Sequence, residues 1–408
     1  MTAPVANLLF DSVSRNTGDI AIGLAAAQLF QARGIASEVV NPFQKTFPSP
    51  LVVGGGELVR LAGDPFYDSY RPRGPHILNA AGVWSSADDL GYLNDYAYVS
   101  ARSLHELEVL NKTVPGAEVL PCATTLLQSD DFEIPGIEPG EPVVGIHMVP
   151  HSLRLIEDLI PIIDAIPYKK VFIPFTHYNG DSSFMKSLPF NKDNSIVLDQ
   201  LNPLQLHSVI RQMNYVVVSS LHASIYAYSQ NIPFASIHQK KAEYYFQDRG
   251  LSSHLVRSDS ELTAILARLD TETFDFTSLI AADTRRIEHA FDRFAGILRA
   301  SAPQAADAAD PTPTTARQQA VLFDQAQMVI GDRDLALSYS ESRRLESRRT
   351  SVQLGHQVES LTSDLDQVRA ALGRAEASLE RRSHALWRRG GRFARRCLHR
   401  LASMLKGS

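Results

Sequence analysis

Short apolar runs alternate with amphipathic segments from residue 5 to about residue 299. Residues 6–10 have the length and apolar character of a strand, and residues 19–33 place apolar side chains at helical spacing. Strands that alternate with helices are typical of parallel βαβ units. The pattern therefore predicts an α/β domain over residues 1–135. Its further strands are expected at residues 37–40, 51–53, 77–79, 98–100 and 118–120.

The alternation breaks at residues 130–142, which hold three prolines and two glycines and have the composition of a linker. It then resumes, with a helix at residues 204–213, and predicts a second α/β domain over residues 142–300. Two such domains with a hinge predict a cleft between them, and open parallel sheets bind ligands at the carboxyl ends of their strands. The strands of this second domain are expected at residues 143–147, 170–176, 195–198, 215–219 and 234–238.

The pattern changes after a linker at residues 301–316 that is rich in Ala, Asp, Pro and Thr. Within residues 317–386, apolar positions recur in steps of four and three over more than three heptads, which is typical of a coiled coil. We therefore expect a homo-oligomer, although one amphipathic helix packed on its own globular part would also use such a face. The positions of this seam are Leu354, Val358, Leu361, Leu365, Val368, Leu372, Ala375 and Leu379.

The last segment, residues 387–408, carries seven Arg and Lys residues and no acidic residue, with apolar side chains between them. A basic amphipathic helix is typical of attachment to the surface of an anionic membrane. A solvated tail or a nucleic-acid-binding arm has a similar composition. We expect a peripheral location on the inner face of the cell membrane.

Composition narrows the class of protein. Apolar residues make up 44% of the 408, which excludes a wholly disordered chain, and the net charge of −5 gives no reason to expect nucleic acid as a partner. Two cysteines far apart argue against a disulfide framework or a metal cluster, so no metal is expected. No signal peptide and no apolar run of about 18–20 residues is recognisable. These features predict a cytoplasmic protein.

Two polar turns follow predicted strands of the first domain. Asn16, Gly18 and Asp19 lie where a helix begins, so Asp19 can cap that helix and free N–H groups can hold an anion. An ordinary strand-to-helix turn has the same composition. The second turn lacks the spacing of a dinucleotide fingerprint, and the chain has no Walker motif, so we expect a glycine loop that lets a ligand approach the backbone. Its residues are Gly54, Gly55 and Gly56.

Two further groups follow strands of the second domain. Ser220 and His222 come after an apolar run at the start of a helix, and Lys241 follows the next strand. A histidine in the interior is usually structural, but one at a strand end beside a helix N-terminus is a candidate acid or base.

The order of these four groups resembles the polysaccharide pyruvyl transferases over roughly residues 7–270. The resemblance rests on Asn-x-Gly-Asp, Gly-Gly-Gly, Ser-Leu-His with a following Ile-Pro, and a lysine before Gly-Leu. Arg102 belongs to a stretch similar to the Val-Ser-x-Arg segment of the family. Many members have an arginine at the position of Ser220, and others have a serine.

The resemblance implies two Rossmann-like domains in a GT-B-like arrangement, which here precede the C-terminal coiled-coil helix. It also implies transfer of a pyruvyl group from phosphoenolpyruvate, as co-substrate without a further cofactor, to a sugar of a cell-surface polysaccharide or its lipid-linked precursor. His222 is then the catalytic residue, and the donor-binding residues are Asn16, Gly18, Asp19, Arg102, Ser220 and Lys241. The alternatives are a GT-B glycosyltransferase that uses a nucleotide sugar, and a catalytically decayed scaffold that acts through its coiled coil.

Overall fold

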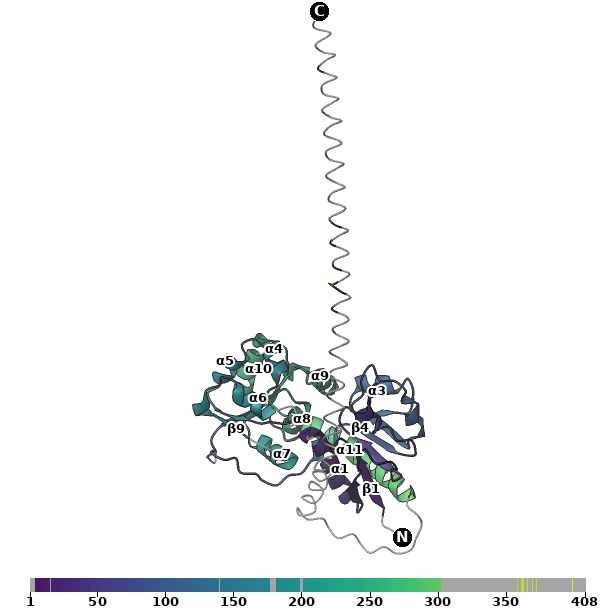
Figure 1. Ribbon diagram of the computed structural model, residues 1–408. Helices are drawn as coiled ribbons and strands as arrows, with labels where there is room; N and C mark the ends of the chain where they lie inside the picture. The colour runs from purple at the N-terminus through teal and green to yellow at the C-terminus, as the bar shows by residue number, and fades with distance from the viewer. Residues whose placement is uncertain are drawn as a thin grey trace, which may run out of the picture. The chain divides into compact units, whose positions relative to one another are not determined.

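The computed structural model describes residues 4–14, 16–138, 140–176, 181–198 and 201–301, with isolated positions 358, 361, 362, 365, 369, 372 and 398 (Figure 1). The predicted linker at 301–316 lies outside the described residues except for Ser301. The predicted coiled coil and basic tail lie outside them except for the isolated positions, which are helical. None of the helices among the described residues is both long enough and apolar enough to cross a bilayer.

The first sheet has six parallel strands in the order β2-β1-β3-β4-β5-β6. Each predicted strand of this part is present, with ends within two residues of the predicted ones. The chain places β2 on one side of β1 and β3 on the other, so the strand order reverses between β1 and β3. The carboxyl ends of such strands are where open α/β sheets bind ligands. The strands are β1 (Val5–Leu9), β2 (Ala36–Val39), β3 (Leu51–Gly54), β4 (Ile77–Ala81), β5 (Tyr98–Ala101) and β6 (Glu118–Val119).

The second sheet is also parallel and six-stranded, in the order β12-β11-β10-β7-β8-β9. Its strand order reverses between β7 and β10. One predicted boundary was wrong: β8 ends at Phe172 instead of residue 176, because Pro174 has no N–H group for the sheet ladder. The strands are β7 (Val143–His147), β8 (Lys169–Phe172), β9 (Ser195–Val197), β10 (Tyr215–Val218), β11 (Phe234–Ile237) and β12 (Leu255–Val256).

Helices follow most strands, as the alternation predicted. In the first part of the chain they are α1 (Thr17–Gln31), α2 (Pro65–Asp68) and α3 (Leu104–Leu110). In the second they are α4 (Pro150–Leu155), α5 (Leu159–Asp164), α6 (Asp181–Ser187), α7 (Pro203–Arg211), α8 (Leu221–Ser229), α9 (Lys240–Gln247), α10 (Asp259–Thr271) and α11 (Thr277–Ser301). Short 3-10 helices are η1 (Leu90–Asp95), η2 (Ala123–Leu126), η4 (Lys192–Asn194) and η5 (Ser252–His254).

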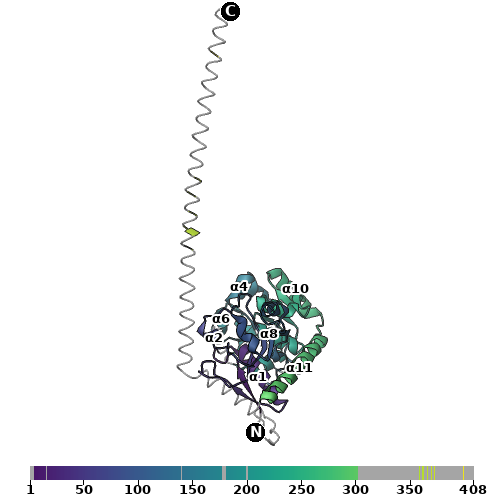
Figure 2. The ribbon, with the colours of Figure 1, turned by 90° about the vertical axis from the view of Figure 1, so that its right-hand side faces the viewer.

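The last long helix, α11, lies alongside α1 (Figures 1 and 2), although it follows the second sheet in sequence. Arg33 at the end of α1 pairs with Asp292 at 2.8 Å. Arg293 pairs with Glu118 of β6 at 2.8 Å, and an aromatic contact joins Phe30 to Phe291 at 5.0 Å between ring centroids. Helix α11 therefore packs against elements of the first sheet.

The central strands of each sheet are apolar, and both of their faces are covered. All residues of β7 and β10 are buried, as expected for central parallel strands. One continuous core cluster contains side chains from α1, α8 and α11, together with residues of both sheets, and two further clusters cover the opposite faces. Burial of this kind leaves the polar strand ends as the places where chemistry can occur.

Candidate functional site

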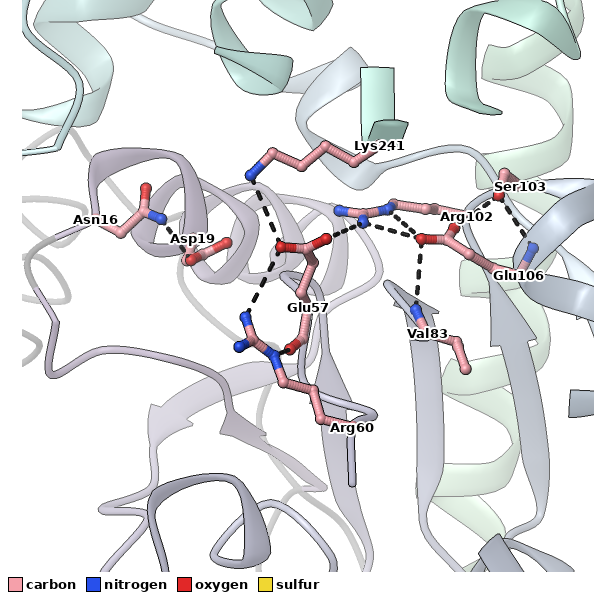
Figure 3. Close-up of polar contacts among 9 residues, drawn as sticks. All are labelled: Asn16, Asp19, Glu57, Arg60, Val83, Arg102, Ser103, Glu106 and Lys241. Atoms are coloured by element: carbon pink, nitrogen blue, oxygen red, sulfur yellow. Dashed lines mark hydrogen bonds and ion pairs between the residues drawn. The ribbon is translucent and has the colours of Figure 1, made fainter. Parts of the chain in front are cut away.

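The turn after β1 is held by its own side chains. Asn16, and not Asp19 as expected from the sequence, is the N-cap of α1: its Oδ1 accepts the Gly18 N–H at 3.1 Å. Its Nδ2 donates to Asp19 Oδ2 at 2.7 Å (Figure 3). Asp19 is therefore in the first turn of α1, where the helix dipole favours negative charge. The cap fixes the direction of the Asp19 carboxyl group.

The glycine loop packs against this turn. Gly55 and Gly56 have φ values of +72° and +65°, in the left-handed region that glycine adopts without strain. A Cβ atom at Gly55 would lie 2.2 Å from a methyl carbon of Ile22, and one at Gly56 would lie 2.8 Å from Asp19 Oδ1. Both glycines are therefore required for the close approach of the β3 end to α1. This packing accounts for them, and contact with a ligand stays a prediction.

A loop after β8 supports the beginning of α1 from the second sheet. The carbonyl oxygen of Phe175 accepts the Thr17 N–H at 3.2 Å and the Thr17 hydroxyl at 2.5 Å. Asp181 Oδ2 in turn accepts the N–H groups of Phe175 and Thr176 at 3.3 and 2.7 Å. His147 Nε2 lies 3.1 Å from the same carboxylate oxygen, and both side chains are buried. Asp181, in buried contact with His147, thus positions the turn that carries Asp19.

His222 lies against the same turn from α8. A Cβ atom at Gly18 would lie 2.1 Å from His222 Nδ1, so the imidazole is packed directly on the Gly18 backbone. Ser220 is the N-cap of α8, and its Oγ accepts the Ala223 N–H at 3.4 Å. The serine at this position therefore has a capping role of its own. His222 therefore packs on the residue that precedes Asp19, although Asp19 and His222 are 203 positions apart in sequence.

Arg102 lies at the carboxyl end of β5 in a buried ionic network. Its Nε and Nη2 donate to Glu106 Oε1 at 3.0 and 2.9 Å, and its Nη2 lies 3.5 Å from Glu57 Oε1. Ser103 donates its hydroxyl to Glu106 at 2.8 Å. The side chains of Arg102 and Glu106 are only 5% and 3% exposed, so the pair is screened from water.

Glu57 forms ion pairs with residues that follow strands of both sheets. It directly follows the glycine loop, and its carboxylate lies 3.7 Å from Arg60 and 3.8 Å from Lys241 Nζ of α9. In Figure 3 the side chains of Asp19, Glu57 and Lys241 are directed toward one another. The side chain of Lys241 is 35% exposed, which makes it more accessible than Arg102.

These surroundings shift the pKa values of Asp19 and His222 in opposite directions. Burial, then the negative charge of Asp11, raises the pKa of Asp19 to about 7, although Lys241 and Arg102 act against this. Burial, then the positive charges of Lys241 and Arg102, lowers the pKa of His222 to about 3. Near pH 7 the Asp19 carboxyl is therefore substantially protonated and His222 is neutral.

The network shifts the pKa values of Glu57 and Arg102 toward their charged forms. Burial would raise the pKa of Glu57, but Lys241, Arg102 and Arg60 outweigh burial and lower it. Burial would lower the pKa of Arg102, but Glu106 and Glu57 raise it well above its ordinary value.

Comparison with known proteins identifies the family of this chain. The model of the family described as polysaccharide pyruvyl transferase matches residues 16–238, which is more than half of the chain. The chain belongs to the polysaccharide pyruvyl transferase family. The resemblance inferred from the sequence motifs is thereby confirmed. The match begins at the Asn16 cap and ends one residue after β11.

Solved structures outside this family are similar at low sequence identity. A Listeria monocytogenes protein described as a UDP-N-acetylglucosamine 2-epimerase is 10% identical, with a TM-score of 0.49 over 73% of this chain and 96% of the other. The UDP-GlcNAc 2-epimerase of Methanocaldococcus jannaschii is 11% identical, with a TM-score of 0.48 over 73% and 99%. A calicheamicin glycosyltransferase is 12% identical, with a TM-score of 0.38 over 74% and 100%. Comparison with curated protein sequences finds no match.

The family motifs supplied most of the site, including Asp19, but not three further carboxylates. The structure brings Asn16, Gly18, Asp19, His222 and the two cations to one place, as their positions at strand ends predicted. Sequence reasoning did not assign roles to Glu57, Glu106 and Asp11. Two of these had local signals: Glu57 directly follows the glycine loop, and Glu106 is four positions after Arg102 on a helix, the spacing of an ion pair.

Proposed function

We propose that this protein transfers a pyruvyl group from phosphoenolpyruvate to hydroxyl groups of a sugar in a cell-surface polysaccharide or its lipid-linked precursor. Membership of the family supports this reaction. The proposal rests on one observation: Lys241, Arg102 and neutral His222 are grouped around the beginning of α1. A donor with a carboxylate and a phosphate requires cations and helix N-termini, and ketal formation requires a group that moves protons.

The proposal gives each residue a role that follows from its exposure. Lys241, the more accessible cation, contacts the anionic donor directly. Arg102 is buried between Glu57 and Glu106, so it adds positive potential and holds Glu57 in place. His222 is the acid/base group of the reaction. Ser220 is the N-cap of α8, and this helix N-terminus faces the donor where many family members have an arginine.

A donor assay tests the proposal. Purified protein should release inorganic phosphate from phosphoenolpyruvate only when a suitable free or lipid-linked sugar is present, because the phosphate leaves as the ketal forms. Release of a nucleotide from a nucleotide sugar would instead support a glycosyltransferase. A scaffold would be supported if no free or lipid-linked sugar gave turnover and the protein bound a partner through residues 350–386.

We also propose that the C-terminal region assembles the protein and holds it at an anionic membrane on the cytoplasmic side. Four positions of the predicted seam are helical and at least 50% exposed, so a second copy of the chain could cover them. They are Val358, Leu361, Leu365 and Leu372. Several copies would present several basic tails, and weak contacts would then add by avidity. Light scattering should give a mass per particle above that of a monomer.

Vesicle flotation tests the membrane contact. The full chain should float with anionic liposomes at low salt and much less with neutral ones, because each basic residue near the surface contributes about 1 kcal/mol. A variant with glutamine at all six tail arginines should stay at the bottom and keep its turnover on a soluble acceptor. Equal recovery with both kinds of vesicle would contradict the proposal. The substituted residues are Arg388, Arg389, Arg392, Arg395, Arg396 and Arg400.

A further inference from the structure

The site holds one carboxyl group that differs from the other acids around it. Asp19 is partly exposed, and its orientation is set by the Asn16 amide at 2.7 Å. Its neighbour Gly18 is in contact with the His222 ring. The Asp19 carboxyl group and the His222 ring are therefore both positioned at the beginning of α1, which follows the switch point of the first sheet.

Charged groups from four parts of the chain act on Asp19. Asp11 follows β1 and Glu57 follows the glycine loop, and both negative charges favour the protonated carboxyl group. Lys241 of α9 and Arg102 after β5 oppose them, but less than burial and Asp11 favour protonation. Tyr226 of α8 and Cys122 also interact with Asp19, and both are buried. At neutral pH the carboxyl group is thus able to give a proton and to take one back.

We propose that Asp19 is a catalytic acid that protonates the methylene carbon of phosphoenolpyruvate, and that His222 is the base that accepts a proton from the attacking sugar hydroxyl. The inference rests on the proposed function and divides its proton transfers between two residues. When the environments of two groups drive their proton affinities apart, the groups are suited to opposite roles.

The proton balance closes with these two residues. Asp19 gives its proton to the methylene carbon while the first sugar oxygen forms a bond to the adjacent carbon and His222 takes the hydroxyl proton. The bond from that carbon to the phosphate oxygen then breaks, and the phosphate leaves with the proton from His222. The second sugar hydroxyl attacks the same carbon, and its proton returns to Asp19. Both residues end in their starting states, without an oxidant or a further co-reactant.

Glu57 is not suited to the acid role. Three cations contact it, and they keep it ionised. An ionised carboxylate cannot give a proton, and beside an anionic donor it needs those cations. A protonated Asp19, by contrast, adds no negative charge that would repel phosphoenolpyruvate.

Replacement of Asp19 by its amide isostere tests the proposal. Asp19→Asn should lower kcat by about 10²–10⁴-fold, the usual contribution of a general acid. The affinity for phosphoenolpyruvate at pH 6, measured by calorimetry, should be unchanged, because the amide and the protonated carboxyl group carry the same charge. Asp19→Glu should restore part of the turnover. A weaker donor affinity with unchanged kcat would make Asp19 only a binding residue and would overturn the inference.

The pH dependence of the wild-type enzyme keeps the inference testable if these variants do not fold. At saturating donor, kcat should fall as the pH rises through about 7, since Asp19 is then ionised. The donor phosphate also titrates, near pH 6. Asp11→Asn separates the two, because it removes the negative neighbour and leaves the donor unchanged, so the fall should move to lower pH. A profile that is flat between pH 6 and 8, or one that Asp11→Asn leaves in place, would contradict the proposal.

Donor binding distinguishes this failure from failure of the proposed function. If the wild-type protein neither binds phosphoenolpyruvate nor releases phosphate from it, the proposed function is wrong. If it does both, and Asp19→Asn turns over at the wild-type rate, only the assignment of the acid is wrong. Thermal stability supplies a second readout: Asp19→Asn should gain stability relative to wild type as the pH rises from about 4 to about 7. In that range the unfolded wild-type chain ionises Asp19 while the folded protein keeps the carboxyl group protonated, so the wild type loses stability and the amide does not.

Discussion

His222→Ala should lower kcat by about 10²–10⁴-fold while the protein stays folded. The imidazole is packed on Gly18 and is neutral because burial and the positive charges of Lys241 and Arg102 lower its pKa to about 3. A neutral imidazole can accept a proton, and alanine cannot. Phosphate release at saturating donor and sugar measures the loss, and circular dichroism establishes that the variant is folded.

A second buried histidine provides the matched control. His254 lies in η5, after α9. Its Nδ1 donates to the Phe234 carbonyl oxygen at 2.8 Å, and its ring stacks on the Phe234 ring. His254→Ala should therefore lower the melting temperature and leave kcat close to that of the wild type. Wild-type turnover in folded His222→Ala would remove His222 from the reaction. An equal loss in both variants would attribute the effect to stability.

Arg102→Ala should lower the free energy of unfolding by about 3–5 kcal/mol, the usual effect of removing one partner of a buried pair. The substitution leaves Glu106, with 3% of its side chain exposed, without its guanidinium partner, and it leaves Glu57 with fewer cations. From sequence alone, the expected result is weaker donor binding. The structure changes that expectation, because Arg102 stabilises the fold before any donor binds.

Denaturant unfolding compares this variant with two others. Arg211→Ala removes an ion pair with Asp131 whose side chains are 40% and 98% exposed, so its effect should be about 0.2–1 kcal/mol. Arg102→Ala combined with Glu106→Gln should recover part of the lost stability, because one of the stranded charges is gone. An Arg102→Ala variant as stable as Arg211→Ala would show that water or rearrangement compensates Glu106.

The strands and most helices were predictable from the sequence because their signals are local. An apolar run bounded by turn residues, such as the one that forms β10, specifies a buried strand wherever it packs. The chemistry at the strand ends was predictable for the same reason: parallel strands bring their carboxyl ends to one edge, so Gly18, His222 and Lys241 could be recognised before their contacts were known.

Other features of the fold depend on contacts between residues that are far apart in the sequence. Nothing along the chain marks α11 as a neighbour of α1, since the pairing of Arg33 with Asp292 joins residues 259 positions apart. The beginning of α1 is held by Phe175 and, through it, by Asp181, and no local pattern links these residues.

The state of Asp19 is the clearest case. Its motif placed it at a helix start, where an isolated aspartate would be ionised and would cap the helix. Asn16 takes the cap instead, and burial with Asp11 and Glu57 favours the protonated form. Periodicity and motif order are properties of neighbours in sequence, so they identify elements and candidate residues. Proton affinity depends on desolvation and on charges a few ångströms away, and for Asp19 these come from segments that only folding brings together.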